Sequence, residues 1–324
     1  MPPSGPEANR CVAVLGGTGW VGRHICATFA RHGYRVVVLA RNPVSGVCHD
    51  RFVPLDLADA PSAVTAGILR AESVDVVVNA TDAANATDGW DRTEDHLIRA
   101  NVGLVTRLLA AIAALPWQPR LVHLGTIHEY GPVDAGTAVA ESAVPRPASA
   151  YARTKLAGST AVLDAARAGL VDGMVLRAVN VCGPYPSPAS LPGKLLTLLD
   201  EAARTGRMRM SIAPARRDFV DVRDLAVAAL KAAERPAVAG PVNIGSGVAV
   251  ALRELVTLFV TGAGFPASII EEEAASVRSL GGDWIAADIR LAGELLDWTP
   301  RIPLDESLKA MWKTHRHPDP PSGC

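Results

Sequence analysis

The sequence predicts an α/β fold, in which a doubly wound parallel sheet is followed by a smaller carboxyl-terminal α/β lobe. Short apolar runs alternate with helical stretches in the first half of the chain, and a glycine-rich turn follows the first run. The runs lack polar alternation, as expected for parallel strands that helices cover on both faces. The expected strands are 11–15, 35–40, 75–79, 120–124 and 174–178. Helices expected at 20–32, 61–71, 92–115 and 149–168 complete right-handed strand–helix–strand units.

A second lobe is expected after Asn180, where a loop rich in Pro, Gly and Ser begins. Its expected elements are helices at 194–205, 252–261 and 303–312 and a strand at 241–244. The predicted division gives residues 10–179 to the first domain, with 219–248 returning to it, 180–218 and 249–315 to the second lobe, and 1–9 and 316–324 to flexible tails.

Composition and charge exclude several classes of partner. The 324 residues carry a formal net charge of −1 without a long basic block, which argues against nucleic acid and anionic membranes. No stretch approaches the roughly 18 apolar residues of a membrane span, and the first ten residues lack the apolar core of a signal peptide. Five cysteines without C-x-x-C spacing predict reduced thiols and a cytoplasmic protein. His315 and His317 supply too few ligands to predict a metal site.

The stretch VAVLGGTGWVG satisfies both G-x-x-G-x-x-G and G-x-G-x-x-G between an expected strand and an expected helix. Glycines let backbone amides approach a pyrophosphate, and the positive end of the following helix favours that anion. At the first strand–helix turn the motif predicts a Rossmann-type dinucleotide-binding domain, whereas the alternative is a glycine-rich loop with no ligand. The expected cofactor contacts in this turn are Gly16, Thr18, Gly19, Trp20, Val21 and Gly22.

The end of the second expected strand bears on the choice of dinucleotide. NAD sites usually place Asp or Glu there to accept a hydrogen bond from the ribose 2′-hydroxyl, but this chain has Ala40 and Arg41. A guanidinium matches the geometry of a 2′-phosphate, and Arg23 in the first helix could assist. The sequence therefore favours NADP(H) over NAD(H). A solvated turn residue is the alternative interpretation of Arg41.

Tyr151 and Lys155 form a Y-x-x-x-K pair on one face of an expected helix. The ordinary pKa of tyrosine is about 10, and the Lys155 ammonium together with an oxidised nicotinamide would favour the phenolate. Thr126 ends an expected strand at its carboxyl end, where ligands bind in open α/β sheets. We predict that Tyr151 exchanges a proton with a carbonyl or carbinol oxygen that Thr126 holds, while hydride moves to or from nicotinamide.

These motifs in this order resemble the extended short-chain dehydrogenase/reductase family, in its nucleotide-sugar epimerase, dehydratase and ketoreductase branch. The resemblance runs from Val12 to about Trp312. Four further segments carry it: T-x-x-x-Y-G at 126–131, N-V-x-G-P at 180–184, R-D-F-x-x-V at 217–222 and N-I-G-S-G at 243–247.

The resemblance assigns roles to further residues. It implies adenine contacts for Asp56 and Leu57, cofactor ribose contacts for Asn79, Ala80 and Thr81, support of the active site by Asn101, and diphosphate contacts for Asn180 and Arg217. It also implies a homodimer, with 92–115 and 149–168 pairing across a two-fold axis. Taken singly, Asn101 could be a buried helix asparagine and Arg217 could pair with Asp218 or Asp221. Asp221 and Asp224 could be helix caps.

The sequence departs from the family at two informative places. Dehydratases that act at C4 and C6 have Asp-Glu after the threonine, but Ile127 and His128 stand here, which excludes that reaction. His128 could be an extra acid–base group or a polar residue lining the pocket. The missing acid after the second strand argues against an epimerase, since the family's epimerases usually use NAD.

The predicted activity is therefore NADPH-dependent reduction of a nucleotide-linked 4-keto-6-deoxyhexose, with dTDP as the expected nucleotide, to the 4-hydroxy sugar. A nucleotide-sugar 4-epimerase is the first alternative, and reduction of a non-sugar ketone or aldehyde is the second. A non-catalytic dinucleotide sensor is the third. Such relatives lack the tyrosine, the lysine or the phosphate-binding arginine, and all three are present here.

Overall fold

The computed structural model describes residues 10–82, 93–236, 238–273 and 282–317. Its main sheet has seven strands in the order β10-β6-β5-β4-β1-β2-β3. All six neighbouring pairs are parallel. The strands are β1 (Cys11–Leu15), β2 (Arg35–Ala40), β3 (Arg51–Pro54), β4 (Val76–Asn79), β5 (Arg120–Thr126), β6 (Asp172–Ala178) and β10 (Gly240–Ile244). The predicted doubly wound parallel sheet is confirmed, and the strand order reverses between β1 and β4.

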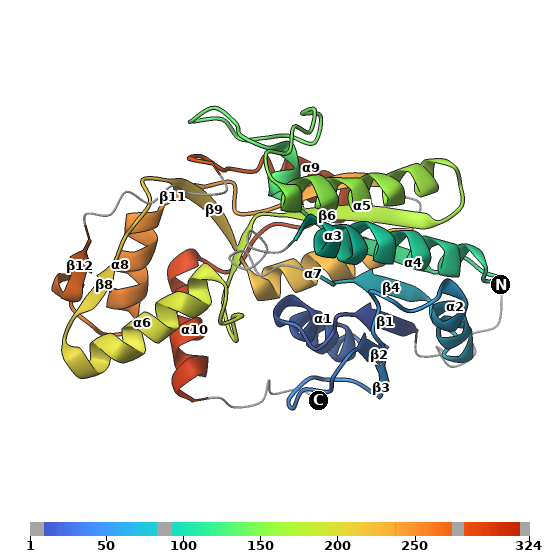
Figure 1. Cartoon of the computed structure of the whole chain (residues 1–324), viewed down its shortest axis with the longest axis horizontal. Coiled ribbons are helices and arrows are strands. Elements are labelled where there is room, and N and C mark those ends of the chain that lie inside the picture. Colours follow the sequence, from blue (N-terminus) through green and yellow to red (C-terminus); the bar gives the residue numbers. More distant parts are fainter. Residues whose placement is uncertain (1–9, 83–92, 237, 274–281, 318–324) are drawn as a thin grey trace.

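Helices cover both faces of this sheet (Figure 1). One face packs against α1 (Trp20–Arg31), α7 (Val222–Ala233) and α9 (Arg290–Leu296). The other packs against α2 (Ser62–Ala71), α4 (Leu104–Ala113) and α5 (Ala150–Arg167). A short helix α3 (Glu94–Leu97) and a π-helix η1 (Ile98–Gly103) lead directly into α4. The first residue of the helix expected at 92–115 lies outside the described residues.

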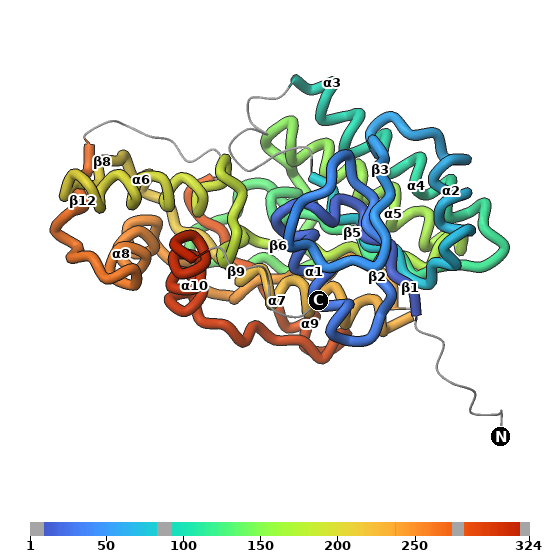
Figure 2. The backbone as a smooth tube through the Cα atoms, turned by 90° about the horizontal axis from the view of Figure 1, so that it is seen from below, coloured from blue at the N-terminus to red at the C-terminus, as the bar shows by residue number. Residues whose placement is uncertain are grey.

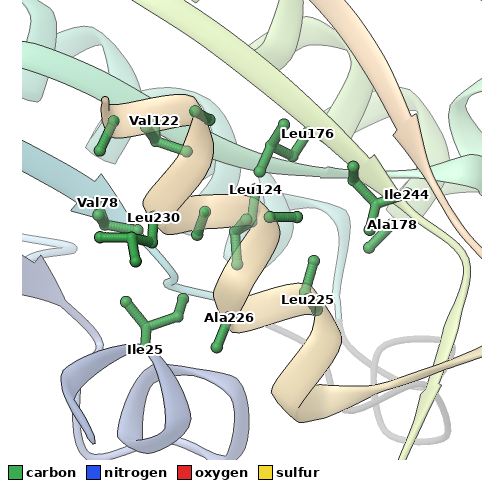
Figure 3. Close-up of a cluster of buried hydrophobic side chains, with 14 of the residues drawn as sticks. Ile25, Val78, Val122, Leu124, Leu176, Ala178, Leu225, Ala226, Leu230 and Ile244 are labelled. Atoms are coloured by element: carbon green, nitrogen blue, oxygen red, sulfur yellow. The ribbon is translucent and has the colours of Figure 1, made fainter. Parts of the chain in front are cut away.

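Alternation of side chains along the strands divides their buried apolar residues between two layers. In β1, Val12 and Val14 belong to the cluster on the α1 and α7 side, while Ala13 and Leu15 belong to the opposite cluster. Figure 3 shows the first layer, where Leu225, Ala226 and Leu230 of α7 face side chains of the sheet. Both faces are apolar because both are covered, which explains why the strands read as unbroken hydrophobic runs.

The second lobe lies at one end of the molecule (Figures 1 and 2). Its helices are α6 (Leu191–Thr205), α8 (Leu252–Gly262) and α10 (Leu304–Arg316), and they share a separate apolar cluster. A three-stranded sheet orders β11 (Ala249–Ala251), β9 (Arg216–Asp221) and β7 (Asn180–Cys182), and a pair joins β12 (Ile270–Glu272) to β8 (Met208–Met210). β10 lies within residues 219–248, which are predicted to belong to the first domain, and it pairs with β6 in the main sheet. The exact division into domains stays a prediction.

Two expectations from the sequence need correction. Cys48 is disulfide-bonded, whereas Cys11, Cys26 and Cys182 are free and buried. The prediction of five reduced thiols was wrong for Cys48, because spacing along the chain does not report which thiols meet in space. Residues 1–9 and 318–324 of the predicted tails lie outside the described residues, whereas Arg316, predicted to begin the second tail, is the last residue of α10.

The expectation that no stretch could span a membrane also needs qualification. Within the described ranges one helix, Glu94–Ala113, is long and apolar enough to cross a membrane by length and composition alone. It is a weak indication of a span, because the core helix of a soluble protein passes the same test. Leu104, Leu108 and Ile112 of this helix are buried in the layer that covers the sheet.

Candidate active site

A cavity of about 640 Å³ lies at the carboxyl ends of β1, β4 and β5, where the strand order reverses. This is the position at which open α/β sheets bind ligands. Ser190, Leu191 and Phe219 contribute to its wall from the second lobe. Fifteen residues predicted as site residues line it: Gly16, Thr18, Gly19, Trp20, Val21, Arg41, Asp56, Leu57, Ala80, Thr81, Thr126, His128, Tyr151, Lys155 and Asn180. Five others do not line it: Gly22, Arg23, Asn79, Asn101 and Arg217.

The glycine turn at the start of α1 has the form that a pyrophosphate requires. The first turn of α1 contains no acidic residue, and no side chain caps its amides. These N–H groups are therefore available to an anion at the positive end of the helix. Gly16 has a φ of +75°, and a Cβ at Gly22 would collide with the carbonyl oxygen of Gly16. The residues present fit a dinucleotide, with Gly22 acting through close packing rather than contact.

The two arginines predicted near a 2′-phosphate are placed differently. Arg41 is exposed at the end of β2 and lines the cavity. The Arg23 guanidinium lies 4.9 Å from the centre of the Tyr185 ring, and its Nη2 donates to the carbonyl oxygen of Ser45 at 3.2 Å. Arg41 is thus the arginine that faces the cavity, whereas Arg23 packs beneath the loop that follows β7.

The Asn79 side chain at the end of β4 holds the segment that follows this strand in place. This side chain is fully buried, and its Oδ1 accepts hydrogen bonds from the Thr81 hydroxyl at 2.6 Å and the Thr81 amide at 3.2 Å. Its amide nitrogen lies 3.0 Å from Nδ1 of His123 in β5. Asn79 therefore positions Thr81 and Ala80 on the cavity wall without reaching the cavity itself.

The predicted trio meets on the cavity wall. Thr126 ends β5, and Tyr151 and Lys155 lie one turn apart near the start of α5, where the Ser149 hydroxyl caps the helix by accepting from the Ala152 amide. Lys155 is buried, and its Nζ donates to the carbonyl oxygen of Leu124 at 2.7 Å. The ammonium is thereby tied to β5 just before Thr126.

The Tyr151 hydroxyl faces a carboxylate on the cavity wall. Its Oη donates to Oδ2 of Asp82 at 3.1 Å. Burial and the neighbouring Asp82 and Glu129 carboxylates raise the pKa of Tyr151 well above its ordinary value, and a hydrogen bond with Thr126 opposes the rise. The sequence predicts a lowered pKa for Tyr151, because that prediction rests on Lys155 and a bound nicotinamide and leaves out Asp82. Asp82 was missed, although its place three residues after β4 offered a signal.

A buried ion pair lies behind Thr126. Oε1 of Glu129 accepts hydrogen bonds from the Thr126 amide at 3.0 Å and the Ser159 hydroxyl at 2.8 Å, and Oε2 pairs with Nε of Arg177 at 2.8 Å. Both charged side chains are almost wholly buried. The Arg177 guanidinium lies 4.5 Å from the centre of the Tyr130 ring. The Glu129 carboxylate thus joins the Thr126 segment, α5 and β6. The T-x-x-E spacing of a capping box could have indicated that Glu129 bonds the Thr126 amide.

His128 and Arg217 lie close enough to influence each other electrostatically. Burial and the charge of Arg217 lower the pKa of His128 to about 4, so the imidazole is neutral near pH 7. Arg217 is buried and donates to the carbonyl oxygens of Arg216, at 3.0 Å, and of Gly282. Burial lowers its pKa to about 10, which leaves it charged. Asn180 reaches the cavity and donates to the carbonyl oxygen of Asp218 at 3.0 Å.

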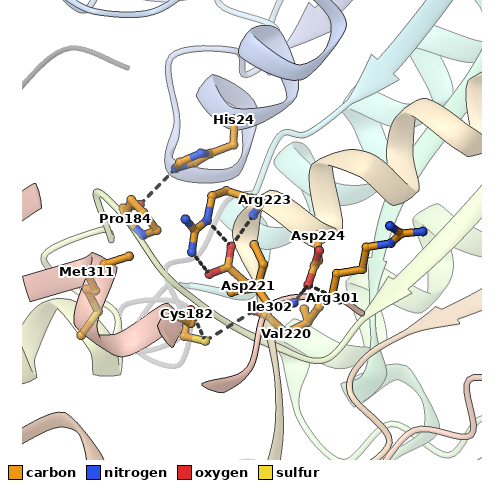
Figure 4. A network of polar contacts seen from close by, with 12 residues as sticks. His24, Cys182, Pro184, Val220, Asp221, Arg223, Asp224, Arg301, Ile302 and Met311 are labelled. Carbon is orange, nitrogen blue, oxygen red and sulfur yellow. Dashed lines mark hydrogen bonds and ion pairs between the residues drawn. The ribbon is translucent and has the colours of Figure 1, made fainter. Parts of the chain in front are cut away.

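Neighbouring acids have structural partners of their own. Asp218 accepts from the Ser246 hydroxyl at 2.6 Å and from three backbone amides, of Ser246, Gly247 and Ala287. Asp221 caps α7 and pairs with Arg223 at 2.7 Å (Figure 4). These contacts do not pair Arg217 with Asp218 or Asp221. Asp221 caps the start of α7, as one interpretation of the sequence suggested. Asn101, within the π-helix, donates to the Thr154 hydroxyl at 3.0 Å, between Tyr151 and Lys155 in α5.

The two lobes are tied together beside the glycine turn. The carbonyl oxygen of Pro184, in the loop after β7, lies 3.1 Å from Nε2 of His24 (Figure 4). The same oxygen accepts a hydrogen bond from Nε1 of Trp20 at 2.9 Å. Asp224 of α7 accepts from the Arg301 and Ile302 amides at 2.9 and 2.8 Å. These contacts fix the second lobe against α1 and α7, so the cavity has a defined shape.

The fold and this cavity define the class of Rossmann-fold proteins that have a glycine turn at α1 and a Y-x-x-x-K helix. Residues 12–245 match the NAD dependent epimerase/dehydratase family. The chain is 38% identical, over 93% of its length and 94% of the relative, to a dTDP-6-deoxy-L-talose 4-dehydrogenase (NAD(P)(+)) of Kitasatospora kifunensis. It is 26% identical to a UDP-glucose 4-epimerase of Rhizobium leguminosarum bv. trifolii, over 95% of this chain and 98% of the relative.

A solved structure of MoeE5 in complex with UDP-glucuronic acid and NAD has the same architecture. It superposes with a TM-score of 0.81 at 26% identity, over 95% of this chain and 99% of MoeE5. The chain belongs to the NAD dependent epimerase/dehydratase family. The resemblance to extended short-chain dehydrogenases/reductases is thus confirmed, as is the expectation of an NAD(P)-dependent enzyme of this family.

Proposed function

We propose that this enzyme reduces a dTDP-linked 4-keto-6-deoxyhexose to the 4-hydroxy sugar with NADPH. The observation that carries the proposal is the Tyr151 hydroxyl at the wall of a cavity that the glycine turn and Arg41 also line. The Kitasatospora kifunensis relative is named as a dehydrogenase at C4 of a dTDP-6-deoxyhexose, and hydride transfer at C4 is reversible chemistry. This relative supports the nucleotide, the sugar class and the position.

Each member of the trio has a separate task in this reaction. A nicotinamide cofactor, when bound, supplies the hydride. Tyr151 donates the phenolic proton to the carbonyl oxygen as charge develops there, and Thr126 holds the same oxygen by its hydroxyl. Lys155, tied to the Leu124 carbonyl, places a positive charge one helical turn from the phenol and stabilises the phenolate that proton donation leaves.

Cofactor choice rests on Arg41. It is a charged, exposed side chain on the cavity wall at the end of β2, where an NAD-specific site would place a carboxylate. A guanidinium there attracts a 2′-phosphate, so the proposed cofactor is NADP(H) in preference to NAD(H). Asp56 and Leu57 on the same wall would contact the adenine.

Substrate contacts are proposed for the opposite wall. His128, as a neutral imidazole, would line the sugar pocket rather than act as an acid, since a pKa of about 4 leaves it without a proton to give near pH 7. Asn180 would contact the diphosphate directly. Arg217 does not line the cavity, so its positive charge would act on the diphosphate from behind His128.

An epimerase is the second candidate, because the Rhizobium leguminosarum relative is a UDP-glucose 4-epimerase. The two functions differ in their use of cofactor. A reductase consumes one NADPH for each sugar, whereas an epimerase interconverts two 4-hydroxy sugars without net consumption.

The decisive assay offers NADPH or NADH with a dTDP-4-keto-6-deoxyhexose and follows the nicotinamide absorbance band. We expect oxidation of NADPH by the wild type and its near-complete loss in Tyr151→Phe. No oxidation by the wild type, or equal oxidation by Tyr151→Phe, would defeat the proposal. Conversion of a 4-hydroxy nucleotide sugar to its C4 epimer without added NADPH would support the epimerase instead.

We further propose a cytoplasmic homodimer, in which α4 and α5 of two subunits form a four-helix bundle. α5 carries several exposed residues along its length, among them Arg153 and Ala157. Light scattering at micromolar concentration should give the mass of two chains. A monomeric mass would exclude the dimer.

A further inference from the structure

Asp82 occupies an unexpected place for an acidic side chain. It follows β4 by three residues and lies on the cavity wall with Thr126 and Tyr151. Its Oδ2 accepts the hydrogen bond of the Tyr151 hydroxyl at 3.1 Å, across 69 residues of sequence. The atom that would give its proton to the substrate is thus already donating to a carboxylate.

The charges that face Tyr151 come from several elements. Asp82 approaches it from the end of β4, and Glu129 from the turn after β5, held in its pair with Arg177. Lys155 follows one turn later in α5, with its Nζ directed to the Leu124 carbonyl. The imidazoles of His96 and His128 line the same cavity, and Arg217 lies close to His128.

Asp82 differs from Glu129 in two respects. It contacts the phenolic hydroxyl itself, and it is exposed, whereas the Glu129 charge is matched by Arg177 in the interior. A carboxylate that accepts a hydrogen bond from a phenol favours the protonated phenol, since two adjacent negative charges repel. Exposure to solvent weakens this repulsion without removing it.

We propose that Asp82 is a positioning residue for Tyr151, which holds the hydroxyl at the cavity wall in the acid form until the bound carbonyl oxygen replaces Asp82 as the acceptor of its proton. The inference rests on the proposed reductase function and adds a residue to it. Reduction needs the protonated phenol, so Asp82 extends the pH range in which the enzyme can reduce a ketone. It cannot alter the reaction equilibrium, because an enzyme residue affects both directions alike.

The test compares Asp82→Asn with the wild type. The amide Oδ1 can still accept the phenolic hydrogen bond, so the variant removes charge while keeping shape. In the reductase assay kcat/KM falls as pH rises through the pKa of the general acid. In Asp82→Asn we expect this fall about one pH unit lower than in the wild type, at the small end of the shifts that one adjacent charge produces. Asp134→Asn, an exposed acid outside the cavity, is the matched control and should leave the profile unchanged.

A second readout does not depend on activity. Phenolate absorbance is titrated in the wild type and in Asp82→Asn, each against its Tyr151→Phe counterpart, so that the difference belongs to Tyr151 alone. Ionisation at a lower pH in Asp82→Asn supports the inference even if no sugar is reduced, in which case only the proposed function fails. The same ionisation pH with and without the Asp82 carboxylate overturns it, whatever the enzyme reduces.

Discussion

Replacing Glu129 by Gln should destabilise the protein strongly and slow the reaction. The substitution keeps the shape of the side chain but leaves the Arg177 guanidinium, 4% exposed, without its counter-charge. It also replaces one carboxylate oxygen by an amide nitrogen, which cannot accept a hydrogen bond. The lost acceptor is either the oxygen that bonds Thr126 and Ser159 or the oxygen that pairs with Arg177. Removing one partner of a buried ion pair costs about 3–5 kcal/mol, so the free energy of unfolding should fall by that amount.

The measurement is urea unfolding followed by circular dichroism. Glu94→Gln is the matched control: Glu94 pairs with Arg153 at 3.3 Å, but both side chains are more than half exposed. Such surface pairs contribute about 0–1 kcal/mol. Glu129→Met combined with Arg177→Met should recover part of the loss, because it leaves no unpaired buried charge.

Catalysis gives the same variant a second test. Glu129 fixes the Thr126 amide, and a displacement of about 1 Å at a positioning group can cost about 100-fold in rate. We expect kcat of Glu129→Gln to fall by about that factor, with a smaller change in KM. A stability loss no larger than that of Glu94→Gln, with an unchanged kcat, would refute the reasoning.

Three further outcomes are expected. Arg41→Asp should shift cofactor preference from NADPH toward NADH, measured as the ratio of kcat/KM values; an unchanged ratio would mean that the 2′-phosphate is read elsewhere. Gly22→Ala should weaken cofactor binding at least about tenfold by calorimetry, because its Cβ would collide with the Gly16 carbonyl, and unaltered affinity would contradict that packing. Burial lowers the pKa of His24 to about 4, so its neutral form stabilises the fold above about pH 6.5 and this stability is lost as pH falls toward 4. His24→Gln should therefore lose less stability than the wild type over that interval in urea titrations, and parallel losses would show that His24 does not titrate there.

The sequence was sufficient for the fold and for much of the cavity wall because both depend on local signals. Valine-rich runs covered on both faces, a glycine turn before α1 and the spacing of Tyr151 and Lys155 can each be recognised within a few residues. Contacts between distant segments could not be recognised in this way. Tyr151 meets Asp82 across 69 residues and Arg177 meets Glu129 across 48, and no periodicity reports either meeting.

Burial explains the remaining differences. Asn79 and Asn101 follow family motifs, but they act from beneath the cavity through Thr81 and Thr154. Arg217 is held by backbone carbonyls rather than by the acids beside it in sequence. Motif position located these side chains in the right region, whereas their partners come from groups that only the folded chain brings beside them.

The shared carbonyl of Pro184 has a consequence for anyone who wishes to redesign this enzyme. Under the proposed function, the loop after β7 is the segment to exchange when a different sugar is wanted, and it is bonded to Trp20 and His24 of α1. A graft that carries only the loop would leave both ring nitrogens facing a foreign backbone. Chimeras should therefore transplant the loop together with residues 20 and 24, as a single exchangeable module.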